Sequence, residues 1–434
     1  MKRKQYILIA FIALCAAVQA QSPMSVEDAV AIALKNNYGI LIAHNDLEIA
    51  KVNNTLGNAG MLPTVALTGS NSYSLSTIDQ KLQGNADSII TNKNVGSNSL
   101  NAAVALNWTL FDGGKMFITK HKLSEIESLY GLQLKDQLLQ TIYAVIAAYF
   151  DVVRQKQQLT SLKDVISYNQ DRVTIVQTGF NAGLSPKTTY LQAQIDLNVF
   201  KETAINQQTV ISVSKRTLNQ LLSRDAETTF DVPDSISLDF APDTNRIRER
   251  LLANNTTVLS QQKQVDVSEQ SLKEFKTLRY PKINFNAGYG FLRTDNTAGS
   301  ILMNQAYGPS VGVGFSLPLY QAGAIDRQIA TARLQLETTR ITLENVKQSI
   351  SVQALNALDA FENQRQLLHI ERDNVALAKE NLDISMQRLR YGQSTSLELR
   401  QAEESYEDSR TRLINIAYNL KIAEAKLKQL LAQM

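Results

Sequence analysis

The sequence contains very little cysteine and histidine, with one Cys and three His among its 434 residues. The cysteine, Cys15, falls in an apolar N-terminal run, and His44, His121 and His369 lie far apart on segments with helical patterns. A disulfide needs two cysteines, and a metal site needs several ligands at short spacings. The sequence therefore predicts no disulfide, no metal centre and no bound cofactor.

Signatures of catalysis and of nucleic-acid binding are also missing. The sequence has no Gly-x-Ser-x-Gly or His-Glu-x-x-His motif, and its glycine clusters near 57–60, 288–290 and 308–314 are not phosphate-binding loops. Without Lys2, Arg3 and Lys4, the 44 Lys and Arg residues fall to 41 and equal the 41 Asp and Glu residues. A neutral chain of this kind is expected to be neither an enzyme nor a nucleic-acid-binding protein.

Long apolar runs are confined to the N-terminus. Residues 7–18 are apolar and follow the basic residues, and Val18 and Ala20 place small residues at the −3 and −1 positions of a cleavage site. This pattern predicts a secretory signal peptide over residues 1–20. After residue 20 the sequence has no run of 18 apolar residues, so it predicts no transmembrane helix.

The sequence does contain a long internal repeat. The segment 110–114 corresponds to 319–323, and 183–185 corresponds to 392–394, each pair being 209 positions apart. Self-similarity at one fixed spacing indicates a duplicated chain. We expect three parts after the signal peptide: a first repeat over residues 21–222, a linker over 223–242 with Pro233 and Pro242, and a second repeat over 243–434.

Each repeat begins with a helical pattern and continues with two segments in which apolar and small polar residues alternate. The alternation predicts strands at about 63–76, 99–111, 281–293 and 305–320. The face opposite the apolar residues carries Gly, Ser, Asn and Thr with almost no charge. A soluble sandwich usually exposes Lys and Glu there, so the pattern favours the wet interior of a membrane barrel, with the sandwich as the alternative.

A helical period follows each strand pair. It predicts long helices over 115–178 and 324–389, which turn into second helices over 186–222 and 395–431. The first long helix would measure about 96 Å at ~1.5 Å per residue, which indicates coiled-coil packing.

Four strands cannot close a barrel in a membrane, because unpaired edge groups in hydrocarbon cost several kcal/mol each. We therefore expect identical copies to share one barrel. Two copies supply eight strands, whereas three supply twelve and leave a pore, and the small inward-facing residues favour three.

The strand-to-helix junctions LNWTLFDGG (106–114) and FSLPLYQAG (315–323) and the helical turns FNAGLSPKTTYLQAQ (180–194) and YGQSTSLELRQAE (391–403) resemble those of TolC-like outer membrane efflux proteins. The similarity covers nearly all of residues 25–431. It implies a mixed α+β, mostly α fold, with a trimeric twelve-stranded β-barrel in the bacterial outer membrane and a long periplasmic α-helical barrel. It also implies a passive exit channel that contacts outer membrane lipid, a periplasmic adaptor and an inner-membrane pump.

The resemblance also implies roles for particular residues. The adaptor would dock at the hairpin tips, formed by Gly183, Leu184, Ser185, Gly392, Gln393 and Ser394. The pore would narrow at Glu398 and Gln401 and at their first-repeat counterparts Thr189 and Gln192. Only Glu398 is a carboxylate, and Leu389 and Ser394 stand where the family has gate-locking partners, so this chain departs from the family's acidic gate. Because Thr395-x-x-Glu398 is also a capping box, Glu398 would either face the pore or cap its helix.

Five aromatic residues are candidates for the membrane interfaces, where amphipathic rings gather, although ordinary strand packing also accounts for them. They are Tyr73, Trp108, Tyr289, Tyr307 and Tyr320.

Three other functions are compatible with parts of this pattern. A protein-secretion channel of type I would use the same fold. A trimeric surface adhesin with a coiled-coil stalk would have one terminal anchor, whereas strand pairs occur in both repeats here. A soluble periplasmic coiled-coil scaffold would lack the membrane barrel.

Overall fold

The computed structural model describes residues 23–81, 89–238, 240 and 247–434. The expected signal peptide, residues 1–20, lies outside the described residues. The chain forms two compact units. One takes in the described residues up to Asn45 together with Leu132–Leu259 and Asn345–Met434, and the other consists of Asp46–Gly131 and Ser260–Glu344.

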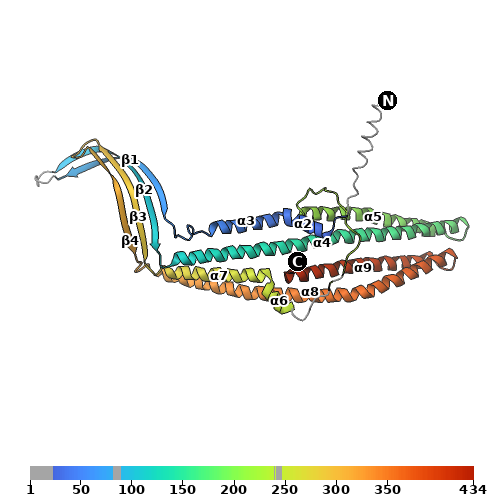
Figure 1. Cartoon of the computed structure of the whole chain (residues 1–434). Helices are drawn as coiled ribbons and strands as arrows, with labels where there is room; N and C mark the ends of the chain where they lie inside the picture. The colour runs from blue at the N-terminus through green and yellow to red at the C-terminus, as the bar shows by residue number, and fades with distance from the viewer. Residues whose placement is uncertain (1–22, 82–88, 239, 241–246) are drawn as a thin grey trace, which may run out of the picture. The chain divides into compact units, whose positions relative to one another are not determined.

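The second unit contains an antiparallel sheet of four strands within the described residues (Figure 1). The strands are β1 (Thr64–Gln80), β2 (Ile90–Phe111), β3 (Lys282–Asn296) and β4 (Met303–Ser316), and they lie in the order β1-β2-β3-β4. The pairing of β2 with β3 joins the hairpin of the first repeat to the hairpin of the second.

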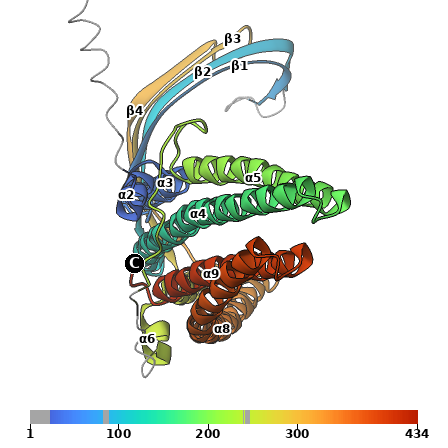
Figure 2. The ribbon, with the colours of Figure 1, turned by 90° about the vertical axis from the view of Figure 1, so that its right-hand side faces the viewer.

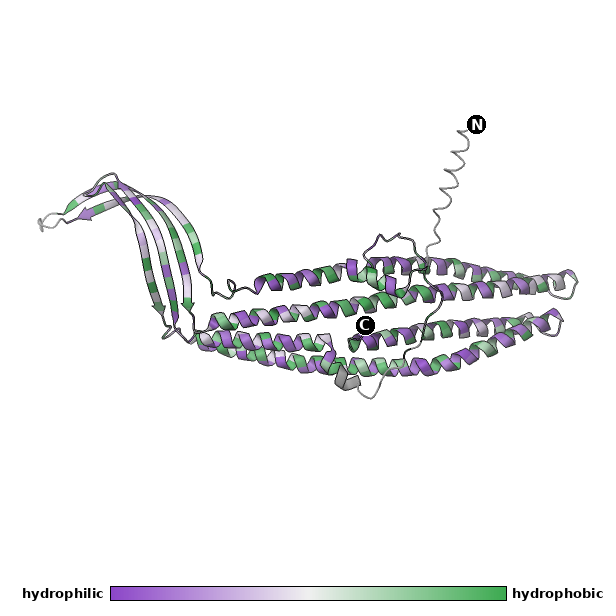
Figure 3. Ribbon diagram, viewed as in Figure 1, coloured by the Kyte–Doolittle hydropathy of each residue, from purple (hydrophilic) through white to green (hydrophobic). Residues whose placement is uncertain are grey.

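The register of the strands places apolar side chains on one side of the sheet, because cross-strand partners share a face. Apolar and polar residues alternate along the strands in Figure 3. Rows on the apolar face are Trp108–Phe285–Val313, Val65–Leu106–Ala287–Val311, Leu67–Val104–Tyr289–Pro309 and Ala102–Phe291–Tyr307. Rows on the opposite, neutral face are Thr64–Asn107–Asn286–Gly312, Ala66–Ala105–Gly288–Ser310 and Thr68–Ala103–Gly290–Gly308.

Several strand ends differ from the sequence expectation, including the end of β1, which runs four residues further, to Gln80. β4 ends at Ser316, so Tyr320 lies in the connection that follows and not in the strand. Pro318 has no N–H to donate to a strand ladder, and Ala322 (φ 47°) and Gly323 (φ 69°) take the left-handed conformation just before the helix that begins at Ala324. β2 begins at Ile90, nine residues earlier than expected, and its first residues pair with the end of β1 after a register shift at Ser76.

The described helices follow the same order in both repeats. They are α2 (Val26–Asn36), α3 (Tyr38–Asn53), α4 (Lys115–Asn181), α5 (Lys187–Leu221), α6 (Ile247–Asn254), α7 (Thr256–Thr277), α8 (Ala324–Arg390) and α9 (Ser396–Leu430). α4 and α8 each contain 67 residues, α5 and α9 each contain 35, and their first residues differ by 209 positions. α4 lies beside α5 and α8 beside α9 as two helical hairpins (Figure 2).

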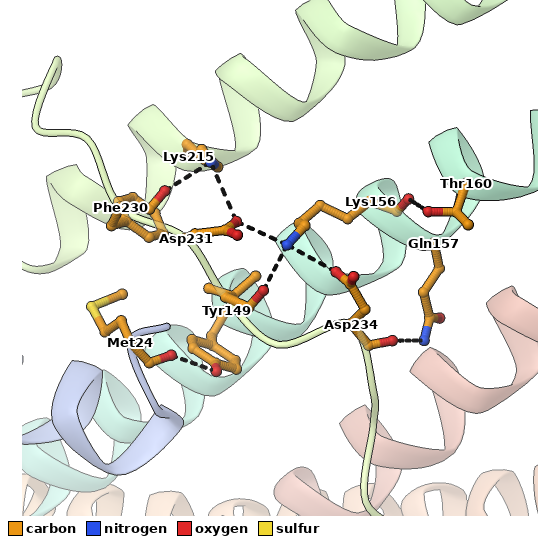
Figure 4. A network of polar contacts seen from close by, with 10 residues as sticks. Met24, Tyr149, Lys156, Gln157, Thr160, Lys215, Phe230, Asp231 and Asp234 are labelled. Atoms are coloured by element: carbon orange, nitrogen blue, oxygen red, sulfur yellow. Dashed lines mark hydrogen bonds and ion pairs between the residues drawn. The ribbon is translucent and has the colours of Figure 1, made fainter. Parts of the chain in front are cut away.

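Polar contacts fasten the linker to the first unit (Figure 4). The ammonium of Lys156 lies 2.8 Å from a carboxylate oxygen of both Asp231 and Asp234 and donates to the carbonyl of Val232 at 2.6 Å. The hydroxyl of Tyr149 donates to the carbonyl of Met24 at 2.8 Å, and burial raises the pKa of this phenol to about 12. An apolar core lies beside these contacts and includes Val145, Val152, Leu218 and Leu222. The linker therefore packs as part of the unit.

Two asparagines show the duplication at atomic detail. Asn37 donates to the carbonyl of Leu221 at 2.8 Å, and Asn255 donates to the carbonyl of Leu430 at 3.0 Å. Each side-chain oxygen also accepts an N–H from the first turn of the next helix, Gly39 in one case and Val258 in the other. Each asparagine thus caps one helix start and one helix end.

Replacing Asn255 with Ala should lower the free energy of unfolding by about 1 to 3 kcal/mol, because the buried carbonyl of Leu430 loses its donor and α7 loses its cap. Thermal melting of the detergent-solubilised protein measures the change. The exposed neighbour Asn254 provides the control, since Asn254→Ala should leave the melting temperature unchanged. Equal melting of the Asn255→Ala variant and the unmodified protein would contradict the assignment.

Candidate functional site

The two hairpin tips have the same backbone conformation. Gly183 (φ 74°) and Gly392 (φ 68°) occupy the left-handed region, which favours glycine. The N–H of the following residue reaches back over the last helical turn, from Leu184 to the carbonyl of Gly179 at 2.8 Å and from Gln393 to that of Arg388 at 2.8 Å. This is the Schellman motif.

The six tip residues lie at the surface of the first unit. Leu184 is 84% exposed, so the first tip presents a large apolar side chain to solvent. Ser185 and Ser394 are half-buried, and Gly183, Gly392 and Gln393 are exposed. The first turn therefore presents backbone groups and the side chain of Leu184 outward, and the second presents backbone groups and Gln393.

Glu398 lies in the first turn of α9, and the expected capping box is only half formed. The hydroxyl of Thr395 accepts the N–H of Glu398 at 3.2 Å, as an N-cap does. The carboxylate of Glu398 does not return to the backbone of Thr395, and it accepts instead from the hydroxyl of Ser394 at 2.6 Å. The side chain remains exposed, so its charge is available to solvent beyond the helix start.

The other constriction candidates differ in their surroundings. Gln401 is exposed one turn after Glu398 on α9. Thr189 is half-buried in the first turn of α5. Gln192 is exposed, and its amide donates to Asp196 at 2.8 Å.

Asp196 leads to a buried group of charges that the sequence expectation missed, the tip charge cluster of Arg172, Asp196 and Glu403. One guanidinium nitrogen of Arg172 lies 2.8 Å from Asp196, and the other lies 2.9 Å from Glu403. Arg172 is 1% exposed and Glu403 is 2% exposed. Burial raises the pKa of Glu403 to about 7, although Arg172 acts to lower it.

A signal for this cluster was present in the sequence. Val165, Asn169, Arg172 and Val176 follow one another by steps of 4, 3 and 4, so Arg172 occupies the buried seam of α4. A charged residue at such a position requires a partner. The sequence does not show which residues of other helices provide it.

The aromatic candidates occupy three kinds of place. Trp108 and Tyr73 lie toward opposite ends of the apolar face, and the indole N–H of Trp108 donates to the carbonyl of Met61 at 2.9 Å. Tyr289 and Tyr307 lie between them on the same face. Tyr320 is 87% exposed beyond the end of β4.

Within the described part of the chain, no helix combines the length and the apolar character needed to cross a membrane. A search of the same residues for metal-binding groups of three or more His, Cys, Asp or Glu side chains finds none.

Comparison with known proteins places these features in one family. The model of the family described as outer membrane efflux protein matches residues 29–224 and 247–433, one segment for each repeat. Among curated proteins, the outer membrane efflux protein BepC of Brucella suis is 22% identical over 327 residues, covering 75% of this chain and 70% of BepC. The proteases secretion protein PrtF of Dickeya chrysanthemi is 19% identical, covering 96% of this chain and 90% of PrtF.

Solved structures share the fold at lower identity. The CmeC outer membrane channel of Campylobacter jejuni has a TM-score of 0.78 at 16% identity and covers 95% of this chain and 89% of that one. The outer membrane protein VceC of Vibrio cholerae has a TM-score of 0.75 at 15% identity and covers 94% of this chain and 95% of VceC. These likenesses confirm the predicted fold class.

Proposed function

We propose, from the premise that this chain belongs to the outer membrane efflux protein family, that three copies form a passive exit channel through the bacterial outer membrane. A periplasmic adaptor would join the channel to an inner-membrane pump. The family match confirms the predicted outer membrane location, and family membership supports a channel and not an enzyme. Energy for transport would come from the pump.

The main observation that supports a trimer is that the sheet has two open edges. β1 and β4 each have one strand neighbour within the described residues, so each leaves an edge of unpaired backbone groups. Such edges cannot face hydrocarbon. Pairing β1 of one copy with β4 of the next closes the wall, and three copies supply twelve strands.

The height of the apolar face supports a membrane crossing. Ile283 to Phe291 on β3 spans about 27 Å along the strand at ~3.4 Å per residue. A tilt of roughly 40° reduces this to about 21 Å, close to the ~25 Å apolar band of outer membrane barrels. The neutral face would then line the water-filled interior.

The long helix α8 carries an exposed apolar stripe that supports contacts between copies. Its members, each 49–65% exposed, recur mostly at multiples of seven residues, which is the period of a coiled-coil seam. They are Leu334, Ile341, Leu355, Ile370, Leu377 and Ile384. We assign this stripe, called the α8 stripe below, to packing against a neighbouring copy.

The hairpin tips are the surface that we assign to the adaptor. The exposed Leu184, beside backbone groups of the two Schellman turns, offers an apolar contact for the end of a partner hairpin. Electrical recording in planar bilayers tests the channel itself. Stable conductance steps from the purified protein support the proposal, and the absence of any conductance would contradict it.

Replacing Glu398 with Gln should lower the preference for cations, because three copies would place three carboxylates around one axis. The reciprocal change, Gln401→Glu, should raise the preference, since Gln401 is exposed one turn further along α9. Reversal potentials in a salt gradient measure both effects. Unchanged selectivity in the Glu398→Gln channel would show that this carboxylate acts only at its helix terminus.

Export of a protein is the second candidate function. PrtF, a relative that matches 96% of this chain, is named as a proteases secretion protein. Loss of a secreted protein from the medium of a deletion strain would support this role. Increased sensitivity to small toxic compounds without such a loss would support efflux.

A further inference from the structure

The tip charge cluster connects the two repeats of one chain. Arg172 belongs to α4 and Asp196 to α5, whereas Glu403 belongs to α9. The guanidinium of Arg172 bonds to both carboxylates, so it ties α9 to the α4–α5 hairpin. Nε of Arg172 and Oε1 of Glu403 are buried without a hydrogen-bond partner, so the cluster is not fully satisfied.

An apolar core adjoins these charges. Leu382 and Met386 from α8 pack with Leu399, Ala402 and Tyr406 from α9, and Tyr168 and Ile175 from α4 cover this group. Since Ala402 directly precedes Glu403, movement of α9 away from α4 would expose both the core and the charges. The exposure of this core would therefore report on the state of the tip charge cluster.

The charges of the cluster balance only when one carboxyl group is neutral. Arg172 provides one positive charge against Asp196 and Glu403. Arg400 lies 3.9 Å from Asp196 and also acts on Glu403, but its positive charge is offset by the carboxylate of Glu404, to which it bonds at 3.1 Å. From α8, Asp383 acts on the neighbouring Tyr168. A proton on Glu403 makes the buried group neutral, and its loss leaves one excess negative charge in a site with little access to water.

We propose that Arg172, Asp196 and Glu403 form a proton-controlled latch, which holds α9 against the α4–α5 hairpin when Glu403 is protonated and loosens when Glu403 is ionised. The direction of this pH dependence follows from the linkage between proton binding and packing. A carboxyl group with a raised pKa stabilises the packed state most at low pH, and this stabilisation is lost as the pH rises through about 7. The pH-dependent packing of α9 is independent of the proposed channel function, whereas any effect of the latch on transport rests on that function.

Thiol labelling can detect the latch, because Cys15 is the sole cysteine of the sequence and lies in the expected signal peptide. Ala402→Cys places a thiol at a position that is 2% exposed, and Gln401→Cys places one at its exposed neighbour. The ratio of their maleimide labelling rates in the detergent-solubilised protein cancels the pH dependence of the reagent. We expect this ratio to rise at least threefold between pH 6 and pH 8.5.

Three further substitutions identify the groups responsible. Glu403→Gln and Asp196→Asn should each abolish the rise, because each leaves the cluster neutral at high pH. Asp164→Asn removes a half-exposed ion pair with Arg410 that also joins α4 to α9, at 2.6 Å, and should leave the rise intact. Asp196→Asn retains the test if the Glu403→Gln protein fails to fold.

A flat ratio in the unmodified background, a rise that persists in Glu403→Gln, or a rise that Asp164→Asn also removes would each overturn the latch. The labelling experiment requires no channel activity. A protein that shows the pH-dependent ratio but no conductance would therefore contradict the channel and support the latch.

Discussion

Replacing Ala102 with Arg should abolish the trimer in the outer membrane, whereas the same replacement of the adjacent Ala103 should leave it intact. The two alanines are neighbours on β2 but lie on opposite faces, Ala102 beside Phe291 and Ala103 beside Gly290. An arginine facing lipid costs about 2 to 4 kcal/mol near the bilayer centre, and the trimer would contain three. An arginine in the lumen stays hydrated.

Membrane fractionation followed by electrophoresis without heating measures the yield of each variant. The Ala103→Arg protein should also conduct with a lower preference for cations, since it adds positive charge to the interior. Equal yields of the two variants would contradict the assignment of the apolar face to lipid. A loss of the trimer confined to the Ala103→Arg variant would show that the neutral face, and not the apolar face, contacts lipid.

The second large effect concerns the α8 stripe. The double variant Leu355→Asp with Leu377→Asp should prevent trimer formation, because both side chains are more than 60% exposed in the single chain and would be buried between copies. Burial of a leucine contributes about 1.5 to 3 kcal/mol, so the six leucines of a trimer contribute about 9 to 18 kcal/mol in total. Sedimentation in detergent distinguishes trimers from single chains.

A matched control lies on the same helix. Gln353 and Lys379 are exposed residues two positions from the two leucines, and they therefore point about 200° around the helix from them. Gln353→Asp with Lys379→Asp should leave the trimer unchanged. A stable trimer of the leucine variant would exclude the α8 stripe from the interface.

Local patterns and the internal repeat predicted most of the architecture. The alternation from Leu100 to Leu110 identified the faces of β2, and the turn glycines Gly183 and Gly392 marked the hairpin tips. The predicted family is confirmed by a match to both repeats. These features depend on neighbours in sequence, which is why one chain was sufficient to find them.

Features that depend on distant partners were less accessible. The first part of β2 has no clean alternation, and it forms because Thr91 pairs with Asp79 across the hairpin. The side-chain partner of Glu398 was missed for a different, local reason, because its carboxylate accepts from the hydroxyl of Ser394 and not from the backbone of Thr395. Arg172 could be placed in a helical seam, but the packing register of α4, α5 and α9 determines which carboxylates it meets.

The central claim is that one chain supplies a third of a closed wall. The mass of the detergent-solubilised particle, measured by light scattering with and without prior heating, tests it most directly. The account predicts a particle of three chains that heating separates into single chains. A single chain that remains monodisperse in buffer without detergent would contradict it.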